Sequence, residues 1–241
     1  MRLTVLGCSG SYPGPGGACS GYLVEDGDLA TRIWLDAGSG TLANLQRHLP
    51  DLGRLDAIVL SHEHPDHWSD LEGFHNVLRF VLERRRFPVY APAGVSEHAY
   101  DDMAPWVEWH DVGDGDRATV GGLGLTFSRT DHGPETLAVR LEGGGRSMGY
   151  SADTGAGWSL GELGDGLDLV LCEATVPQEM EGQMQHLSAR QAGESARAAG
   201  VRRLVLTHLW PTLDPERSRA EGSAAFGRPV EVAAVDRSWD L

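Results

Sequence analysis

The sequence predicts an α/β fold in which sheets and helices form layers. Short apolar runs rich in β-branched residues alternate along the chain with longer helical patterns, and turn residues separate them. Strand-like runs occupy 2–7, 21–25, 31–36, 56–61, 88–91, 123–130, 136–142, 146–151, 168–172 and 203–207. Helical patterns occupy 40–49 and 71–86. This alternation is typical of layered α/β proteins, but periodicity alone does not choose among their architectures.

One helix near the C-terminal end has clear start and stop signals. Ser188 is a suitable N-cap, Gln191 three residues later completes a capping box, and an alanine-rich body ends at Gly200. By contrast, the glycine-rich stretches 113–124 and 143–145 are expected to be hairpin loops, because no helix start follows them.

The composition predicts one domain that spans residues 1–241. With 41% hydrophobic residues, a chain of this length can bury a sizeable core. No run approaches the roughly 20 apolar residues that cross a bilayer, and the first strand begins without a signal-peptide core, so a cytoplasmic protein is expected. Cys8, Cys19 and Cys172 lack metal-type spacing and are expected to be packing residues rather than disulfide partners.

A cluster of histidines suggests a metal site. The heptapeptide Ser-His-Glu-His-Pro-Asp-His follows a strand-like run and contains the pattern HxHxDH. Alternation along extended chain points His62 and His64 to the same side, whereas Pro65 turns the backbone so that Asp66 and His67 approach from another direction. Imidazole and carboxylate suit divalent transition metals, so this spacing favours a site for two adjacent ions over a solvated histidine-rich loop.

Other candidate ligands follow later strand-like runs. His132, Asp153 and His208 each stand directly after such a run in the second half of the chain. A histidine or aspartate in that position is more often a cap or turn residue, and only the recurrence of one pattern makes these three candidates. His186 stands just before the capped helix, and on its own it is explained as well by settling the first helical turn, or by simply being exposed, as by a functional role.

The order of these motifs resembles the metallo-β-lactamase superfamily. HxHxDH is followed by Asp131-His132-Gly133, Ser151-Ala152-Asp153 and Thr207-His208. More specifically, three stretches resemble the phosphodiesterases related to tRNA 3′-processing ribonuclease Z, namely Leu6-Gly7-Cys8-Ser9-Gly10-Ser11, Trp34-Leu35-Asp36-Ala37-Gly38, and the segment from His186 through the helix to His208-Leu209-Trp210-Pro211. The resemblance covers nearly the whole chain and implies a four-layer αβ/βα sandwich.

The same resemblance implies ligands for two divalent metal ions. One ion would be held by His62, His64 and His132, the other by Asp66, His67 and His208, with Asp153 as the bridge. Two ions roughly 3.5–4 Å apart can share a hydroxide that attacks phosphorus and can stabilise the leaving oxygen. Zinc is the expected metal and manganese or iron are alternatives, because all three accept imidazole and carboxylate.

Catalytic roles are also implied. Asp66 would orient the nucleophile, and His186 would act as the general acid that protonates the departing alkoxide. Asp36 and Glu173 are expected to support the ligands through hydrogen bonds, although turn or other hydrogen-bonding roles explain them equally well.

Two departures from ribonuclease Z argue against a nucleic-acid partner. Asp153 follows His132 by only 21 positions, too few for the Gly/Pro-rich arm that grips tRNA in that family. The formal net charge of −15 also opposes a polyanion. Arg84-Arg85-Arg86 is a local basic run, but at the end of the predicted helix 71–86 it is expected to complement the helix dipole and face water.

The favoured substrate is therefore a small phosphodiester. The sequence as a whole resembles bacterial enzymes that open 3′,5′-cyclic nucleotides, so cyclic AMP is the expected substrate and 5′-AMP the product. Trp68 and Trp210 could stack a base, but packing explains them at least as well. The run from Gly7 to Gly21 is expected to form a loop on the rim of the site, and it lacks the GxGxxG pattern of a dinucleotide site. The remaining histidines are treated as ordinary surface or core residues, namely His48, His75, His98 and His110.

Three other functions stay open from the sequence. A ribonuclease acting on tRNA 3′ ends would need a further binding surface, which a homodimer could provide, since relatives are often homodimers. A lactonase or thioesterase would use the same metals to polarise a carbonyl group. A non-enzymatic metal-binding or nucleotide-sensing protein ranks low, because every expected ligand and the proposed acid are present. No membrane partner is expected.

Overall fold

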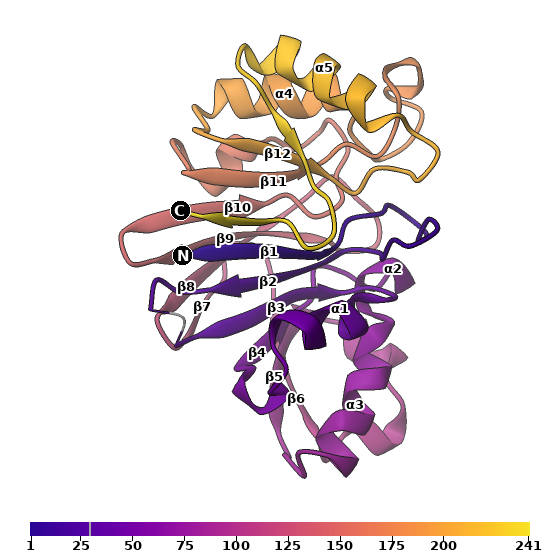
Figure 1. Ribbon diagram of the computed structural model, residues 1–241, viewed down its shortest axis with the longest axis vertical. Coiled ribbons are helices and arrows are strands. Elements are labelled where there is room, and N and C mark those ends of the chain that lie inside the picture. The colour runs from indigo at the N-terminus through magenta and orange to yellow at the C-terminus, as the bar shows by residue number, and fades with distance from the viewer. Residues whose placement is uncertain (29) are drawn as a thin grey trace.

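Two β-sheets packed face to face form the centre of the molecule, and helices cover the outer face of each sheet (Figure 1). The computed structural model describes residues 1–28 and 30–241. In these residues, the first sheet has the strand order β14-β1-β2-β3-β4-β5-β6 and the second has the order β13-β12-β11-β10-β9-β8-β7. The predicted α/β class and four-layer αβ/βα sandwich are confirmed.

The first sheet combines the N-terminal part of the chain with its last strand. Its strands are β1 (Arg2–Gly7), β2 (Gly21–Glu25), β3 (Arg32–Ala37), β4 (Ala57–Val59), β5 (Phe87–Pro92), β6 (Val107–Val112) and β14 (Ser238–Asp240). The second sheet contains β7 (Arg117–Val120), β8 (Leu123–Arg129), β9 (Leu137–Gly143), β10 (Arg146–Tyr150), β11 (Leu169–Glu173), β12 (Leu204–Thr207) and β13 (Glu231–Val232). Strands β3 to β6 run parallel, as do β10 to β13.

Helices and short 3-10 turns connect the strands. The described α-helices are α1 (Thr41–His48), α2 (Pro65–Trp68), α3 (Asp70–Phe80), α4 (Ala189–Ala198) and α5 (Pro215–Phe226). The 3-10 turns are η1 (Leu52–Arg54), η2 (Val95–His98), η3 (Asp101–Met103), η4 (Leu160–Leu163) and η5 (Gln178–Met180). None of the helices in the described residues is long and apolar enough to cross a membrane.

Three apolar clusters hold the four layers together. One lies between the sheets, one between the first sheet and α1 with α3, and one between the second sheet and α4 with α5. Ile33 of β3 lies between the sheets, whereas its neighbour Trp34 packs edge-on against Phe74 of α3. Because both faces of these strands are buried, they read as continuous apolar runs, which is why the sequence revealed them.

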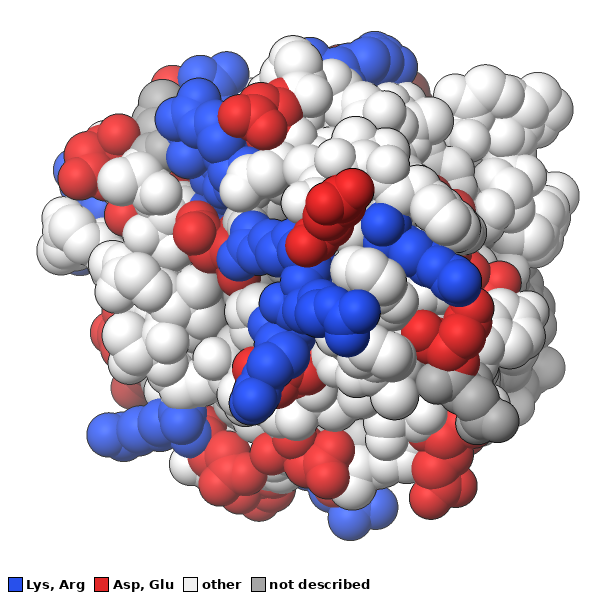
Figure 2. Space-filling view, turned by 90° about the horizontal axis from the view of Figure 1, so that it is seen from below, with Lys and Arg blue, Asp and Glu red and all other residues white. Residues whose placement is uncertain are grey.

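Helix α3 is shorter than the sequence predicts. The pattern 71–86 is rich in helix formers, but the helix ends at Phe80, so the expectation that Arg84-Arg85-Arg86 complements its dipole is wrong. Tertiary contacts take precedence here. Arg84 donates a hydrogen bond to the carbonyl oxygen of Leu55, and the guanidinium of Arg85 lies over the Trp106 ring. Arginines gather on the face at this end of the molecule, but acidic side chains are interspersed among them (Figure 2).

The glycine-rich stretches behave differently from each other. Gly144 and Gly145 join β9 to β10 with left-handed φ angles of 59° and 73°, so the hairpin predicted at 143–145 is confirmed. The prediction that 113–124 is only a loop is wrong, because it contains β7, which pairs with β8. Strand β7 is an edge strand with alternate residues exposed, so it lacks the apolar run of a buried strand.

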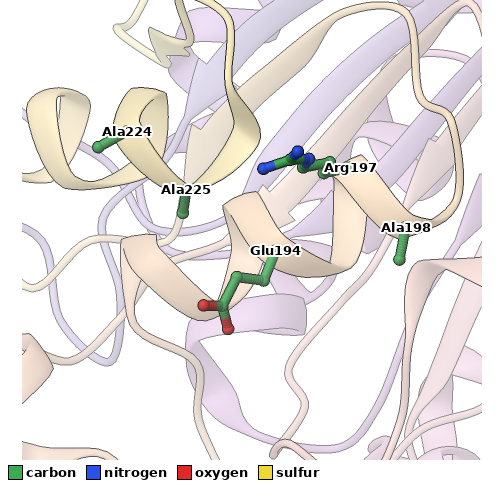
Figure 3. A pocket seen from close by; sticks show the side chains of 5 residues that line it. All are labelled: Glu194, Arg197, Ala198, Ala224 and Ala225. Carbon is green, nitrogen blue, oxygen red and sulfur yellow. The ribbon is translucent and has the colours of Figure 1, made fainter.

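Strand β6 and helix α5 were missed for similar reasons. Strand β6 is an edge strand whose interior carries Glu, His and Asp. Helix α5 buries Ser218, Gly222 and Phe226, a face made mostly of small residues rather than large apolar ones. The helix predicted from Ser188 is confirmed, including the capping box with Gln191. A surface groove between α4 and α5 is lined by Glu194, Arg197, Ala198, Ala224 and Ala225 (Figure 3).

Candidate metal centre

The candidate ligands meet where several strands end. His62 and His64 follow β4, His132 follows β8, Asp153 follows β10 and His208 follows β12. In open sheets, the carboxyl ends of parallel strands are the usual place for a site, because loops and helix starts expose polar groups there. Asp66 and His67 lie in α2, whose first residue is Pro65, and His64 is its N-cap. Both sheets therefore contribute side chains to one cluster.

One half of the cluster contains His62, His64, His132 and Asp153. A ligand atom of each lies within 4.8 Å of the others. His62 Nε2 is 3.0 Å from His64 Nδ1, and His132 Nε2 is 3.4 Å from the same Nδ1. Asp153 Oδ2 lies 3.7 Å from His62 Nε2. His62 and His64 therefore point to the same side of the chain, as the sequence predicts.

The other half contains Asp66, His67 and His208. Asp66 Oδ2 and His67 Nε2 are each 3.1 Å from His208 Nε2. The second oxygen of Asp153, Oδ1, lies 3.3 Å from His67 Nε2 and 3.5 Å from His208 Nε2. Asp153 therefore presents one oxygen to each half, as a bridging carboxylate would.

The donor set fits divalent cations. Asp153 Oδ1 is buried and has no hydrogen-bond partner among the described residues, although buried polar atoms are normally paired. Imidazole nitrogens of His67 and His208 lie near this oxygen atom, but neither forms a hydrogen bond with it. Buried imidazoles and carboxylates facing a common point are the chemistry that divalent transition metals accept.

Hydrogen bonds on the opposite ring nitrogens aim four histidines at the cluster. The Nδ1–H of His67 donates to Asp36 Oδ2 at 2.7 Å, and that of His132 donates to the carbonyl oxygen of Gln185 at 3.0 Å. His208 donates to Thr175 Oγ1 at 2.7 Å. His62 Nδ1 lies 3.0 Å from Ser61 Oγ, which itself donates to Asp36. These partners fix the ring orientation and leave Nε2 toward the centre.

His186 is held beside the cluster by Glu173. Its Nδ1 lies 3.1 Å from Glu173 Oε1, and Glu173 also accepts hydrogen bonds from the backbone N–H groups of Thr154 and Leu187. Burial would lower the pKa of His186, but the Glu173 carboxylate outweighs it and raises the pKa to about 9. The contact with Glu173 therefore favours the protonated form of His186.

Burial and neighbouring charges set the protonation of the cluster itself. Burial lowers the pKa of His62 well below its ordinary value, so this ring is neutral. Burial would raise the pKa of Asp153, but His208 and His67 hold it well below its usual range. Burial would likewise lower the pKa of His67, yet Asp153 and Asp36 raise it well above the ordinary value. A metal ion bound at His67 Nε2 would need that nitrogen unprotonated, so protons would compete with the metal at this residue.

Left-handed backbone conformations concentrate at this site. Asp36, Ala152, His208 and Ser11 have φ angles of 54°, 51°, 56° and 61°. For residues other than glycine, such conformations cost on the order of 1–3 kcal/mol each and persist where surrounding contacts impose them. The close fit leaves no room for larger residues: a Cβ at Gly38 would lie 2.0 Å from the Asp66 carbonyl oxygen.

The seven predicted ligand residues and the predicted acid therefore lie together, and their roles stay predictions.

The other residues singled out in the sequence have ordinary structural contacts. Trp68 is 8% exposed and packs in the apolar cluster between the first sheet and α3, which favours its packing role. Trp210 is half-buried and bonds to the loop after β1. His48 and His98 pair with Asp236 and Glu63, whereas His110 stacks on Tyr90 and His75 is buried in α3. All three cysteines are free thiols, as predicted.

Sequence reasoning missed several residues that support the cluster. Ser61, Thr175 and Gln185 lie within two positions of a residue that it did identify, so adjacency was their only signal. Tyr150, whose hydroxyl donates to Asp36, has no such signal. Ser11, which bonds to Asp66, was named only as part of the stretch from Leu6 to Ser11 and of the predicted rim loop, without a role of its own.

Comparison with known proteins identifies the family. A model described as a beta-lactamase superfamily domain matches residues 31–209. An uncharacterized protein of Mycobacterium tuberculosis is 34% identical across all of this chain and 92% of its own length. The probable metallo-hydrolase YhfI of Bacillus subtilis is 28% identical over the full length of both chains, and its crystal structure matches with a TM-score of 0.89, 27% identity and 99% of each chain covered. A ribonuclease Z of Methanopyrus kandleri is 30% identical over 98% of this chain and 96% of its own.

These similarities agree with the fold and with the clustered histidines and aspartates. The chain belongs to the beta-lactamase superfamily and is a metal-dependent hydrolase.

Proposed function

We propose that the protein is a phosphodiesterase that opens 3′,5′-cyclic AMP to 5′-AMP. The observation that carries the proposal is the half-buried His186, whose Nδ1 lies 3.1 Å from Glu173 Oε1 at the edge of a cluster suited to divalent cations. Hydrolysis of a phosphodiester needs both an activated water and an acid for the departing oxygen, and this arrangement has a place for each.

The assigned ligands are the seven clustered residues. His62, His64 and His132 would hold one ion, Asp66, His67 and His208 the other, and Asp153 would contact both. When bound, the ions would supply Lewis-acid activation of water and of the phosphoryl group. We favour zinc, with manganese or iron as alternatives.

The chain's own residues would complete the reaction. Asp66 orients the attacking water toward phosphorus. The oxygen of that water forms a bond to phosphorus as the bond from phosphorus to O3′ breaks, and the proton that the water loses passes to solvent. His186 gives its Nε2 proton to O3′, while Glu173 stabilises the imidazolium before transfer and keeps the ring oriented. Water then returns the proton to His186. The product is a 5′-nucleotide with a free 3′ hydroxyl.

Charge and loop length favour a small substrate. Between His132 and Asp153, the chain forms the β9–β10 hairpin with a tight glycine turn and has no long arm. A net charge of −15 disfavours extended nucleic acid through the long-range field, whereas one cyclic nucleotide presents a single phosphodiester charge.

A ribonuclease acting on tRNA is the second candidate. The 30% identity to a ribonuclease Z over nearly the whole chain supports it. Such an activity would need a surface for the tRNA body, and its rate would fall steeply with salt because phosphate contacts release counterions.

One experiment separates these functions. Metal content would be measured on the purified protein together with hydrolysis of cyclic AMP, bis(p-nitrophenyl) phosphate and a tRNA precursor at matched salt and metal. About two metals per chain with efficient opening of cyclic AMP are expected. Turnover of only the generic diester would refute the cyclic AMP assignment, efficient tRNA cleavage would favour the ribonuclease, and absence of metal and hydrolysis would overturn both.

A further inference from the structure

The loop after β1 reaches the candidate metal centre through Ser11. The backbone N–H of Ser11 donates to Asp66 Oδ2 at 2.8 Å. That same carboxylate oxygen lies 3.1 Å from His208 Nε2. The backbone of Ser11 is thus one hydrogen bond away from a candidate ligand atom, which places this residue at the edge of the candidate metal centre.

Several contacts hold the loop in this position. The N–H of Gly10 donates to the carbonyl oxygen of Leu209 at 2.9 Å, and a Cβ at Gly10 would lie 2.4 Å from the carbonyl oxygen of His208. Ser11 itself has a left-handed φ of 61°. A strained serine fixed at the mouth of a site suggests a functional constraint, because a glycine would adopt this conformation without strain.

The side chain of Ser11 has one hydrogen-bonding role filled and one free. The indole Nε1–H of Trp210 donates to Ser11 Oγ at 3.1 Å. The hydroxyl therefore acts as an acceptor toward Trp210, and its own hydrogen remains available because Ser11 is exposed. The Trp210 bond limits where that hydrogen can point.

A phosphodiester matches this donor. Its two non-bridging oxygens carry the negative charge and act only as acceptors, so each gains from a fixed hydroxyl donor. Trp210 then has a role that does not depend on stacking a base, because its N–H orients the serine.

We propose that Ser11 Oγ donates a hydrogen bond to a non-bridging phosphoryl oxygen of the substrate, and that Trp210 is the positioning residue for this hydroxyl. This inference rests on the proposed phosphodiesterase function and names the group that recognises the phosphoryl oxygen. It makes Ser11 a determinant of phosphoryl binding that is separate from the metal ligands.

The main test compares Ser11→Ala with the natural protein, both loaded with zinc. A hydrogen bond to a charged group predicts an increase of about tenfold to a hundredfold in KM for cyclic AMP. The dissociation constant for inorganic phosphate, measured by calorimetry, should rise by a similar factor while metal content stays the same. Unchanged KM and phosphate affinity would overturn the proposal.

The fold offers a matched control for both residues. Trp158 Nε1 also donates to a serine hydroxyl, that of Ser128, at the same distance of 3.1 Å. Trp210→Phe keeps the aromatic ring but removes the donor, so it should reproduce part of the Ser11→Ala effect. Trp158→Phe and Ser128→Ala should leave phosphate affinity within twofold of the natural value. Equal losses at both pairs would show a general effect of folding and refute the assignment.

Phosphorothioate substrates locate the contact on phosphorus. Sulfur is a weaker acceptor than oxygen, and the Rp and Sp forms of cyclic adenosine phosphorothioate place it on opposite faces. The natural protein should discriminate between the two forms, and Ser11→Ala should change that ratio whereas Ser128→Ala should not. An unchanged ratio would contradict a contact from Ser11.

Failure of the proposed function would be recognised separately. It would appear as no phosphodiester turnover by the natural protein at full metal content. The phosphate calorimetry would still report on Ser11, so a loss of phosphate affinity in Ser11→Ala would support the recognition role, and no loss would refute it.

Discussion

The hydroxyl of Tyr150 donates to Asp36 Oδ2 at 2.7 Å across the interface between the two sheets. Tyr150 ends β10 in the second sheet, whereas Asp36 lies in β3 of the first. The same carboxylate oxygen accepts the Nδ1–H of His67. One sheet therefore helps to orient a candidate ligand that the other sheet supplies, and it does so through a fully buried carboxylate.

Tyr150→Phe should weaken metal binding without unfolding the protein. The substitution removes one donor from Asp36, which then orients His67 less firmly. Loss of such an outer hydrogen bond typically costs 10-fold to 100-fold in metal affinity. Competition between the metal-free protein and a chromophoric chelator would measure the change.

Tyr22→Phe is the control for that variant. Tyr22 is equally buried, lies 5.3 Å from the Tyr150 ring, and bonds to Thr207 Oγ1 instead of Asp36. Its loss should lower stability by about 1 kcal/mol and leave metal affinity nearly unchanged. Equal loss of metal affinity in both variants would contradict a specific role for the Tyr150 hydroxyl.

Glu173→Gln should shift the pH profile of kcat. Because the Glu173 carboxylate raises the pKa of His186 to about 9 against the opposing effect of burial, the acid form persists to alkaline pH in the natural protein. Turnover should be constant below this pKa and fall as pH rises through about 9. Without the carboxylate, burial dominates and the fall should move toward neutral pH.

His186→Ala completes this test. This variant should retain metal and lose most turnover of cyclic AMP. The fall of kcat as pH rises through about 9 should also disappear. Substrates with a good leaving group, such as bis(p-nitrophenyl) phosphate, need less protonation and should lose less activity. Full turnover of cyclic AMP by His186→Ala would remove this residue as the acid.

Removing metal should lower both activity and thermal stability. A free metal concentration 100-fold above Kd contributes about 2.7 kcal/mol per bound ion. In a domain of this size, that corresponds to a rise of about 5–10 °C in Tm. Scanning calorimetry before and after chelation, and after return of zinc or manganese, would measure it.

Single ligand variants identify where that stabilisation originates. His64→Ala and Asp153→Ala should lose metal, activity and the metal-dependent rise in Tm. His110→Ala alters a histidine that stacks on Tyr90, outside the cluster, and should keep all three. A normal metal response in Asp153→Ala would be incompatible with its assigned bridging position.

Gly38→Ala should disturb the position of Asp66. The added Cβ would lie 2.0 Å from the Asp66 carbonyl oxygen, so the backbone must move, and overpacking of this kind costs about 1–3 kcal/mol. Gly124→Ala is the control, since its Cβ would meet nothing closer than 3.9 Å. The urea concentration at half-unfolding and the metal content should both fall in Gly38→Ala. Neither should fall in Gly124→Ala.

Residue patterns predicted the elements whose burial is uniform. Strands such as β3 and β11 are buried on both faces, and their apolar runs are visible in the sequence. The edge strands β6 and β7 and the small-residue face of α5 carry weaker patterns, because solvent or close helix packing replaces large apolar side chains.

In the candidate site, the sequence predicted the residues that belong to local motifs but not the contacts that depend on tertiary packing. Motif order located the clustered histidines and aspartates, five of which follow the end of a strand while Asp66 and His67 lie in α2. The bond from Tyr150 to Asp36 depends on how two sheets pack, and the bond from Ser11 to Asp66 depends on a loop folding back across the site. Neither relationship leaves a periodic signal in the sequence.

The division of the cluster between the sheets also bears on cooperativity. His62 and His67 follow a strand of one sheet, whereas Asp153 and His208 follow strands of the other. A bound ion would therefore act as a crosslink between the two halves of the sandwich, and opening either half would require the ion to leave. Amide hydrogen exchange in β4 and β10 should accordingly slow together on metal loading, so that two separately exchanging sheets become one kinetic unit.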